Sequence, residues 1–102
     1  MDWNNTILHA ACSVPKGHNI ISELLKLNVK TDFKNKELEL PIHIAIKYDH
    51  TECIETLINH KKFLLFVIDK NGFGLIHKAS EHLALKSIEL IIKHQINVDS
   101  FI

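Results

Sequence analysis

Histidine and cysteine are the residues of this 102-residue chain whose side chains could ligate a metal ion, or act as a nucleophile and its base. The chain has eight histidines, but no two of them have the HxxxH spacing that places a pair on one face of a helix. Its two cysteines, Cys12 and Cys53, lie far apart and form no CxxC pair. The spacing therefore argues against a zinc site, and we predict no metal ligands.

Sequence motifs for catalysis are absent as well. With three glycines, the chain has no glycine-rich phosphate loop, and it has no GxSxG nucleophile motif. Cys12 and Cys53 fall at positions that the repeat pattern below predicts to be packed, where burial raises the pKa of a thiol and suppresses its nucleophilicity. We therefore predict no enzymatic activity, no catalytic residues, no cofactor and no small-molecule substrate.

The charged residues balance, with 12 Lys+Arg and 12 Asp+Glu, and every basic one is a lysine. A chain without arginine lacks the bidentate group that reads phosphate and guanine, so nucleic acid is not the expected partner. The longest apolar run, residues 63–68, has six residues, against about 20 for a membrane span. Unpaired cysteines and an N-terminus without a signal peptide indicate an intracellular protein, in the cytoplasm or alternatively in the nucleus.

The sequence repeats with a period of 34 residues, and this repeat predicts the helices that position the histidine and cysteine side chains. Three sets of residues coincide at this interval: His9, His43 and His77, then Ala11, Ala45 and Ala79, then Leu8, Ile42 and Ile76. A triple match at one period in so short a chain is hard to obtain by chance, and a period between about 20 and 50 residues is typical of stacked repeats.

Each repeat is predicted to form a short helix, a tight turn and a longer amphipathic helix. Apolar residues with helical spacing follow each repeat histidine: Ile20, Ile21, Leu24 and Leu25, then Cys53, Ile54, Leu57 and Ile58, then, with one polar substitution, Ser87, Ile88, Ile91 and Ile92. The pattern predicts helices over 6–13, 19–27, 41–48, 51–60, 75–82 and 85–94. Pro41 suits a first helical turn, where its missing N–H would have no partner.

These repeats resemble the ankyrin repeats, whose unit of about 33 residues opens with T-P-L-H-x-A. The matching segments are residues 6–11, 40–45 and 74–79, with Gly17-His18 and Asp49-His50 between helices and residues 69–72 and 97–99 as fingers. The resemblance implies an all-α solenoid of stacked helix-turn-helix units with short finger loops. It also implies a single domain over 1–102, with repeats at about 4–37, 38–71 and 72–102.

The repeat assignment implies structural roles for most histidines. His9, His43 and His77 occupy the signature, where the imidazole is expected to bond backbone groups of the adjoining turn. For His18 and His50 we expect a similar role at the turns between helices. His60 and His94 are expected to cap helix C-termini, where a cation is favoured. His82 is the exception, because it falls on the outer part of a first helix, which the family leaves variable.

The chain also departs from the family pattern. Only Thr6 retains the signature threonine, so the threonine–histidine hydrogen bond is unavailable at Leu40 and Gly74, and we expect those turns to be less rigid. Neither terminus shows a polar capping repeat, and the chain stops at residues 99–102, where another finger would start. Because terminal repeats need polar outer faces, our hypothesis is a piece of a longer array, or a domain covered by a partner.

The resemblance implies a protein-protein interaction module that presents a concave surface of first helices and fingers, as an adaptor, inhibitor or scaffold. The residues predicted to face a partner protein are Ser13, Ile44, Lys47, Tyr48, Lys78, Glu81 and His82 on the helices, and Lys34, Asn35, Lys36, Lys70, Asn71 and Phe73 on the fingers. Tyr48 and Phe73 are the expected anchors, although Phe73 could instead pack on its own finger. The alternative is a structural spacer of a longer repeat protein, without a specific partner.

The apolar run of residues 63–68 occupies the second predicted finger, which is normally polar. Successive side chains of an extended strand alternate between faces, so these residues cannot all point inward. One interpretation is that half of them fill the groove between the second and third repeats and that the rest lie on a locally bent loop. The other is that Phe63, Leu65 or Phe66 forms an exposed patch that binds a partner.

Overall fold

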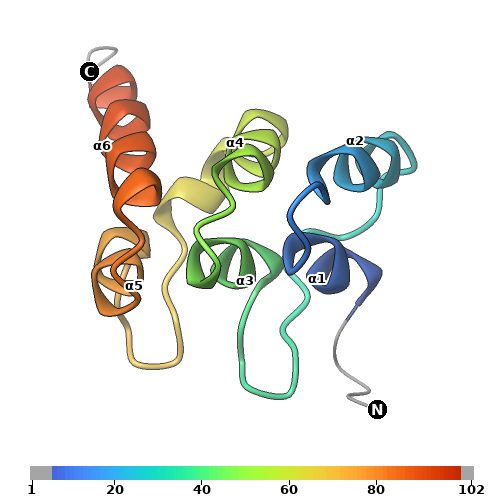
Figure 1. Cartoon of the computed structure of the whole chain (residues 1–102), viewed down its shortest axis with the longest axis horizontal. Coiled ribbons are helices and arrows are strands. Elements are labelled where there is room, and N and C mark those ends of the chain that lie inside the picture. Colours follow the sequence, from blue (N-terminus) through green and yellow to red (C-terminus); the bar gives the residue numbers. More distant parts are fainter. Residues whose placement is uncertain (1–5, 100–102) are drawn as a thin grey trace.

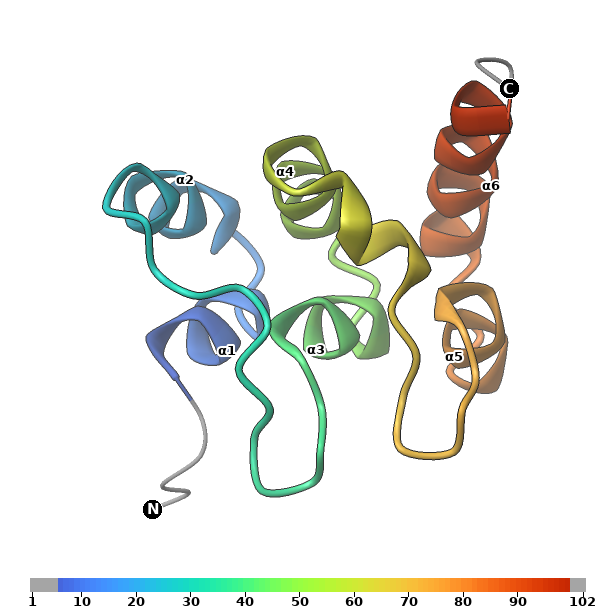
Figure 2. The same cartoon turned by 180° about the vertical axis from the view of Figure 1, so that it is seen from behind.

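The computed structural model describes residues 6–99, with side chains through residue 96. Its helices are α1 (Ile7–Cys12), α2 (His18–Lys26), α3 (Pro41–Lys47), α4 (Thr51–His60), a 3₁₀ helix η1 (Lys62–Phe66), α5 (Leu75–Glu81) and α6 (Leu85–Asp99). The described part contains no strand, which confirms the predicted all-α class. Helices α1, α3 and α5 form one row and α2, α4 and α6 a second, with two finger loops projecting beyond the first row (Figure 1 and, from behind, Figure 2).

The core lies between the two rows and joins successive repeats. Helix α1 contacts α3, and α3 contacts α5, while α2 contacts α4 and α4 contacts α6. The apolar stripe of each second helix faces this core, as Ile54, Leu57 and Ile58 of α4 show by being fully buried. Cys12 and Cys53 are buried there as free thiols, and burial raises the pKa of both, that of Cys53 to about 11.

In the first two repeats, the first helix begins with hydrogen bonds that involve the signature histidine. The Thr6 hydroxyl accepts a bond from the His9 N–H, and the Thr6 N–H donates to His9 Nδ1, which together form a capping box. In the second repeat the Leu40 N–H donates to His43 Nδ1 at 3.0 Å, but Leu40 offers no side-chain cap, as expected. Gly74 likewise offers no side-chain cap to α5.

His77 does not follow His9 and His43, so its expected role is wrong. His9 is buried and its Nε2 lies 2.8 Å from the Glu39 carbonyl oxygen of the following finger. No finger follows the third repeat within the described residues. The His77 ring is therefore exposed and stacks on Phe73, with the ring centroids 3.8 Å apart.

The last helix is longer than the sequence predicted. Helix α6 continues to Asp99, so residues 97–99 are helical rather than a finger. His94 consequently lies inside the helix, with its Nε2 4.0 Å from Glu55 Oε1 of α4, and the predicted capping role at a helix end is wrong. The expected start of another finger at residues 100–102 lies outside the described residues.

The apolar run of residues 63–68 is not an extended finger strand. Its first part forms η1, a 3₁₀ helix directly after α4. Residues i and i+3 of a 3₁₀ helix share one side. Phe63 and Phe66 accordingly are both exposed while Leu64 and Leu65 are buried, so alternation was the wrong rule and Leu65 is not part of any exposed patch.

Gly17, which precedes α2, is required by a close approach of two backbone segments. A Cβ atom at this position would lie 1.7 Å from the Ala11 carbonyl oxygen. We expect Gly17→Ala to lower the free energy of unfolding by about 1–3 kcal/mol, the usual cost of overpacking. Urea denaturation followed by circular dichroism measures this free energy of unfolding.

Gly74→Ala is the matched control, because a Cβ there meets nothing within 4 Å and the backbone φ of −75° suits any residue. Its free energy of unfolding should stay within about 0.5 kcal/mol of the original chain. Equal effects of the two substitutions would contradict the assignment of Gly17 to a close contact.

His43 is buried as a neutral imidazole, which makes stability depend on pH. Burial, and then the charge of Lys78, lower its pKa from 6.5 to about 4, against opposing contributions from Asp69 and Glu39 and a further lowering by Lys34. The unfolded chain takes up a proton near pH 6.5, whereas the folded one resists it. The stabilisation is therefore complete above about pH 6.5 and is lost as the pH falls towards about 4.

We expect this loss to reach at most about 3 kcal/mol, measured as urea midpoints at intervals between neutral pH and pH 4. His43→Gln removes the titrating group, so its stability should change less over this range. His82→Gln, at an exposed histidine, should keep the original pH dependence. Parallel curves for the chain and His43→Gln would show that another group is responsible. An NMR titration of the His43 ring protons reads the pKa directly.

Candidate functional site

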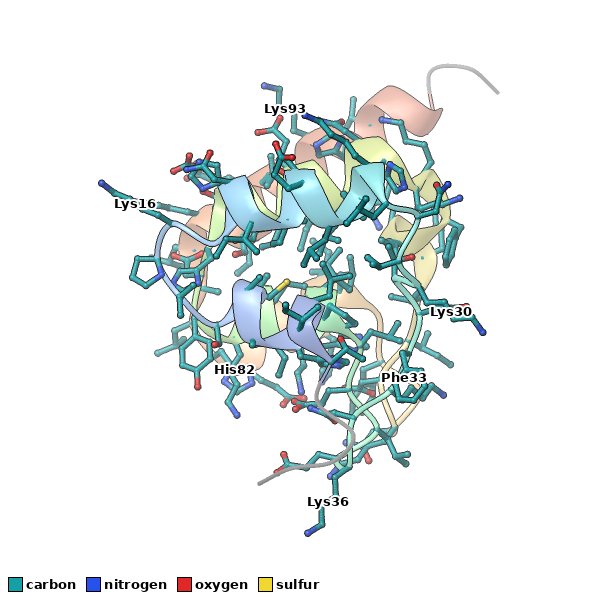
Figure 3. All side chains as sticks on the ribbon, turned by 90° about the vertical axis from the view of Figure 1, so that its right-hand side faces the viewer. Lys16, Lys30, Phe33, Lys36, His82 and Lys93 are labelled. Atoms are coloured by element: carbon teal, nitrogen blue, oxygen red, sulfur yellow. The ribbon has the colours of Figure 1, made fainter. Side chains whose placement is uncertain are left out.

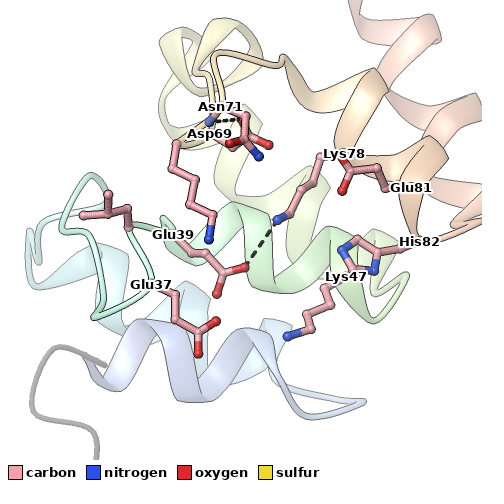
Figure 4. Close-up of a pocket in the computed structure, with 10 residues that line it drawn as sticks. Glu37, Glu39, Lys47, Asp69, Asn71, Lys78, Glu81 and His82 are labelled. Carbon is pink, nitrogen blue, oxygen red and sulfur yellow. Dashed lines mark hydrogen bonds and ion pairs between the residues drawn. The ribbon is translucent and has the colours of Figure 1, made fainter.

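A cleft of about 260 Å³ opens on the finger side of the first helices, between the second and third repeats. Helix α3 contributes Lys47, α5 contributes Lys78 and Glu81, and His82 follows directly after α5. The two fingers contribute the other lining residues, Glu37, Leu38, Glu39, Asp69, Lys70 and Asn71. Figure 4 shows these side chains converging on the cleft from both fingers and both helices.

An ion pair between Glu39 and Lys78 forms the floor of the cleft. Glu39 Oε2 lies 3.4 Å from Lys78 Nζ, and the two side chains are only 10% and 12% exposed (Figure 4). Two buried opposite charges hold each other in place, because either alone would carry a large desolvation cost. Lys78 was predicted to face a partner. It lies in the cleft, and its ammonium group is already paired there with Glu39.

The two fingers are built by the same turn, 34 residues apart. Asn35 Oδ1 accepts from the N–H groups of Glu37 and Glu39, both at 2.9 Å. Asp69 Oδ1 accepts from the N–H groups of Asn71 and Phe73, at 2.8 and 3.0 Å. Burial alone would raise the pKa of Asp69, but these two donors, together with the charges of Lys78 and His43, lower that pKa below its ordinary value.

The turn corrects the predicted role of Asn35. Its side chain is buried and bonds the finger backbone, with Nδ2 also 3.3 Å from Glu39 Oε1. Asn35 therefore shapes the finger rather than facing outward at its tip. Lys70 and Asn71 follow Asp69 in the second finger and are exposed at the rim of the cleft.

The rim of the cleft carries exposed charges of both signs. Lys47 and Lys70 supply cations and Glu37 an anion, and none of these three side chains makes an ion pair with any described residue. Glu81 lies 3.6 Å from the Nε2 atom of His77, and both side chains are about half exposed. The rim can thus offer both an acceptor and a donor of charge-assisted hydrogen bonds to a bound group.

A second, adjoining hollow of about 170 Å³ extends the cleft towards the first repeat. It shares Glu37, Glu39 and Lys47 with the cleft, and adds Asn35, Ile44 and, from the first repeat, His9, Ala10 and Ser13. The two hollows together make one groove along α1, α3 and α5. Ile44 was predicted to face a partner, but it is only 9% exposed, which makes it part of the groove wall rather than a projecting anchor.

The other residues predicted to face a partner lie outside this groove. Tyr48 is exposed at the end of α3 and stacks on His50, and Phe73 stacks on His77. Lys34 and Lys36 are exposed on the first finger, where Figure 3 shows Lys36 projecting beyond the stack. Phe63 and Phe66, on η1, line other hollows of the molecule.

Sequence reasoning predicted Glu81 but missed the two other glutamates of the cleft, Glu37 and Glu39. The signal that could have located them is the 34-residue offset itself, since Asn35-x-Glu37-x-Glu39 aligns with Asp69-x-Asn71-x-Phe73. An Asx turn at each position predicts that both fingers fold back in the same way.

Other kinds of site were sought in the described residues. No three His, Cys, Asp or Glu side chains gather there in a way that could hold a metal ion. Helices long and apolar enough to cross a bilayer are not found among these residues either.

Comparisons with known proteins agree with this architecture. The family model for ankyrin repeats, in three copies, matches residues 8–101. Over 55 residues, 54% of its length, the chain is 33% identical to the nuclear factor NF-kappa-B p110 subunit of Drosophila melanogaster, of which this stretch covers 6%. Ankyrin repeats generally mediate protein-protein interaction and are not a catalytic family. The signature helices, the two rows and the match over nearly the whole chain show that it belongs to the ankyrin-repeat family.

Proposed function

We propose that the chain binds a partner protein in the groove along α1, α3 and α5, and acts as an adaptor, inhibitor or scaffold. The observation that carries this proposal is the cleft between the second and third repeats. Six of the residues predicted from the sequence line it: Lys47, Lys70, Asn71, Lys78, Glu81 and His82. They come from two helices and a finger, yet they meet around one hollow.

The electrostatics of the groove favour a partner segment with charges of both signs. Lys47 and Lys70 attract carboxylates, and Glu37 and Glu81 attract ammonium or guanidinium groups. The floor is held by the Glu39–Lys78 pair, so little side-chain freedom is lost there on binding. The exposed rim charges would mainly set the association rate and the choice of partner.

We propose an intracellular location, in the cytoplasm or the nucleus. Two buried free thiols suit a reducing compartment. A relative named as a nuclear factor subunit supports the same assignment. The three repeats are proposed to act as one domain.

A charge-reversed groove tests the proposal. The chain is immobilised, proteins of a cell lysate are retained on it, and each is quantified by mass spectrometry. A specific partner should be retained at least about tenfold less by Lys47→Glu/Glu81→Lys, because the two rim charges then repel the groups they attracted.

The matched control is Glu23→Lys/Lys26→Glu, which reverses an exposed ion pair on α2, on the other row of helices. It should retain the partner at the original level. If both double variants retain it equally, the partner does not use the groove. If retained proteins are lost with the α2 variant instead, the binding surface lies on the second row of helices.

A further inference from the structure

The two ends of the stack expose side chains at positions that are buried inside it. Because the repeats are equivalent, one position can be compared in up to three copies that have different neighbours. Some positions of a repeat face the following repeat and others face the preceding one. Both kinds show the same contrast between the inside and the ends.

Positions that face the following repeat are exposed only in the third copy. Ile58 of α4 is fully buried, as α6 packs against this helix, while the equivalent Ile92 of α6 is 44% exposed. His43 is fully buried and His77 is exposed. Within the described residues, nothing covers this side of α5 and α6.

Positions that face the preceding repeat are exposed only in the first copy. Leu75 at the start of α5 is 2% exposed against α3, whereas the equivalent Ile7 of α1 is 61% exposed. Cys53 of α4 is fully buried, and the equivalent Ile20 of α2 is 49% exposed. The first repeat thus exposes Ile7 of α1 and Ile20 of α2. Figure 1 shows that α1 and α2 lie at the opposite end of the stack from α5 and α6.

The two end faces carry the positions through which successive repeats pack inside the chain. The face of the first repeat presents the positions that the second and third repeats use to cover their predecessors. The face of the third repeat includes a hollow of about 520 Å³ beside Ile76, His77 and Ser80 of α5. In the second repeat the position of Ser80 is held by the fully buried Ile46, and α5 packs against its helix.

We propose that these faces bind each other in different copies of the chain, so that α1 and α2 of one copy stack on α5 and α6 of the next. The occupant of each end is a second copy, because one chain carries both complementary faces in the same register. The contact continues the interface already formed between repeats. It would bury Ile7, Ile20 and Ile92 and extend the groove from one copy to the next.

A contact between two different faces does not close on itself. The structure therefore predicts head-to-tail growth rather than a closed dimer. In sedimentation velocity and light scattering of the 102-residue chain, the weight-average mass should rise steadily with concentration. A monomer at every accessible concentration overturns the proposal.

Two substitutions on opposite ends make the test specific. Ile20→Glu places a charge in the end face of the first repeat, and Ile92→Glu places one in the end face of the third. Each variant alone should therefore be monomeric. Mixed in equal amounts, they retain one intact pair of faces and should form a heterodimer that grows no further. Failure of the mixture to associate, with both variants folded by circular dichroism, contradicts the proposal.

A control variant distinguishes end-to-end stacking from non-specific apolar association. Phe33→Glu places the same charge in the loop between α2 and α3, at a phenylalanine that is 46% exposed and lies outside the groove, and should leave the rise in mass unchanged. Loss of association in this variant would show non-specific apolar contact instead. If either end variant unfolds, Ile7→Glu and Ile96→Glu, at exposed isoleucines of α1 and α6, repeat the same complementation.

Discussion

The placement of Glu39 is the constraint on which the rest of the structure depends. This residue precedes α3 and touches all three repeats. Its carbonyl oxygen lies 2.8 Å from His9 Nε2 of the first repeat, and its carboxylate pairs with Lys78 of the third. Its N–H donates to Asn35, which closes the finger. A buried carboxylate must keep such partners, so the three repeats and the first finger are held in one register.

The repeat histidines show how much a solenoid unit depends on its neighbour. His9, His43 and His77 occupy one position of the repeat, yet their environments differ. The first bonds the next finger, the second is fully buried, and the third is exposed and stacked on Phe73. The same side chain is structural or available according to whether another repeat follows. This dependence makes the ends of the stack chemically unlike its interior.

The floor of the groove is held by an ion pair, whereas its rim carries exposed charges without ion-pair partners among the described residues. The Glu39–Lys78 pair and the two Asx turns hold the backbone and the floor. Lys47, Lys70 and Glu37 are exposed around them without ion-pair partners among residues 6–96. Such an arrangement suits recognition, because the shape is set before binding while the charges that select a partner remain accessible.

The sequence by itself determined the fold class, the 34-residue period, five of the six α-helices to within one residue at each end, and the burial of both cysteines. These features follow from local rules: helical spacing of apolar residues and the signature at the start of each first helix. It also singled out most of the groove residues, since the register shows which side of a first helix faces the fingers.

Only the tertiary structure decided which of those residues are free. Asn35 and Lys78 look like surface residues in the sequence, but a folded finger and a carboxylate 39 residues away bind them. The 3₁₀ turn that buries Leu65 and exposes Phe66 depends on packing against α4 and α6, which no local pattern encodes. His77 is the clearest case. Its type and position predict a buried histidine, and only the absence of a covering finger, within the described residues, leaves it exposed.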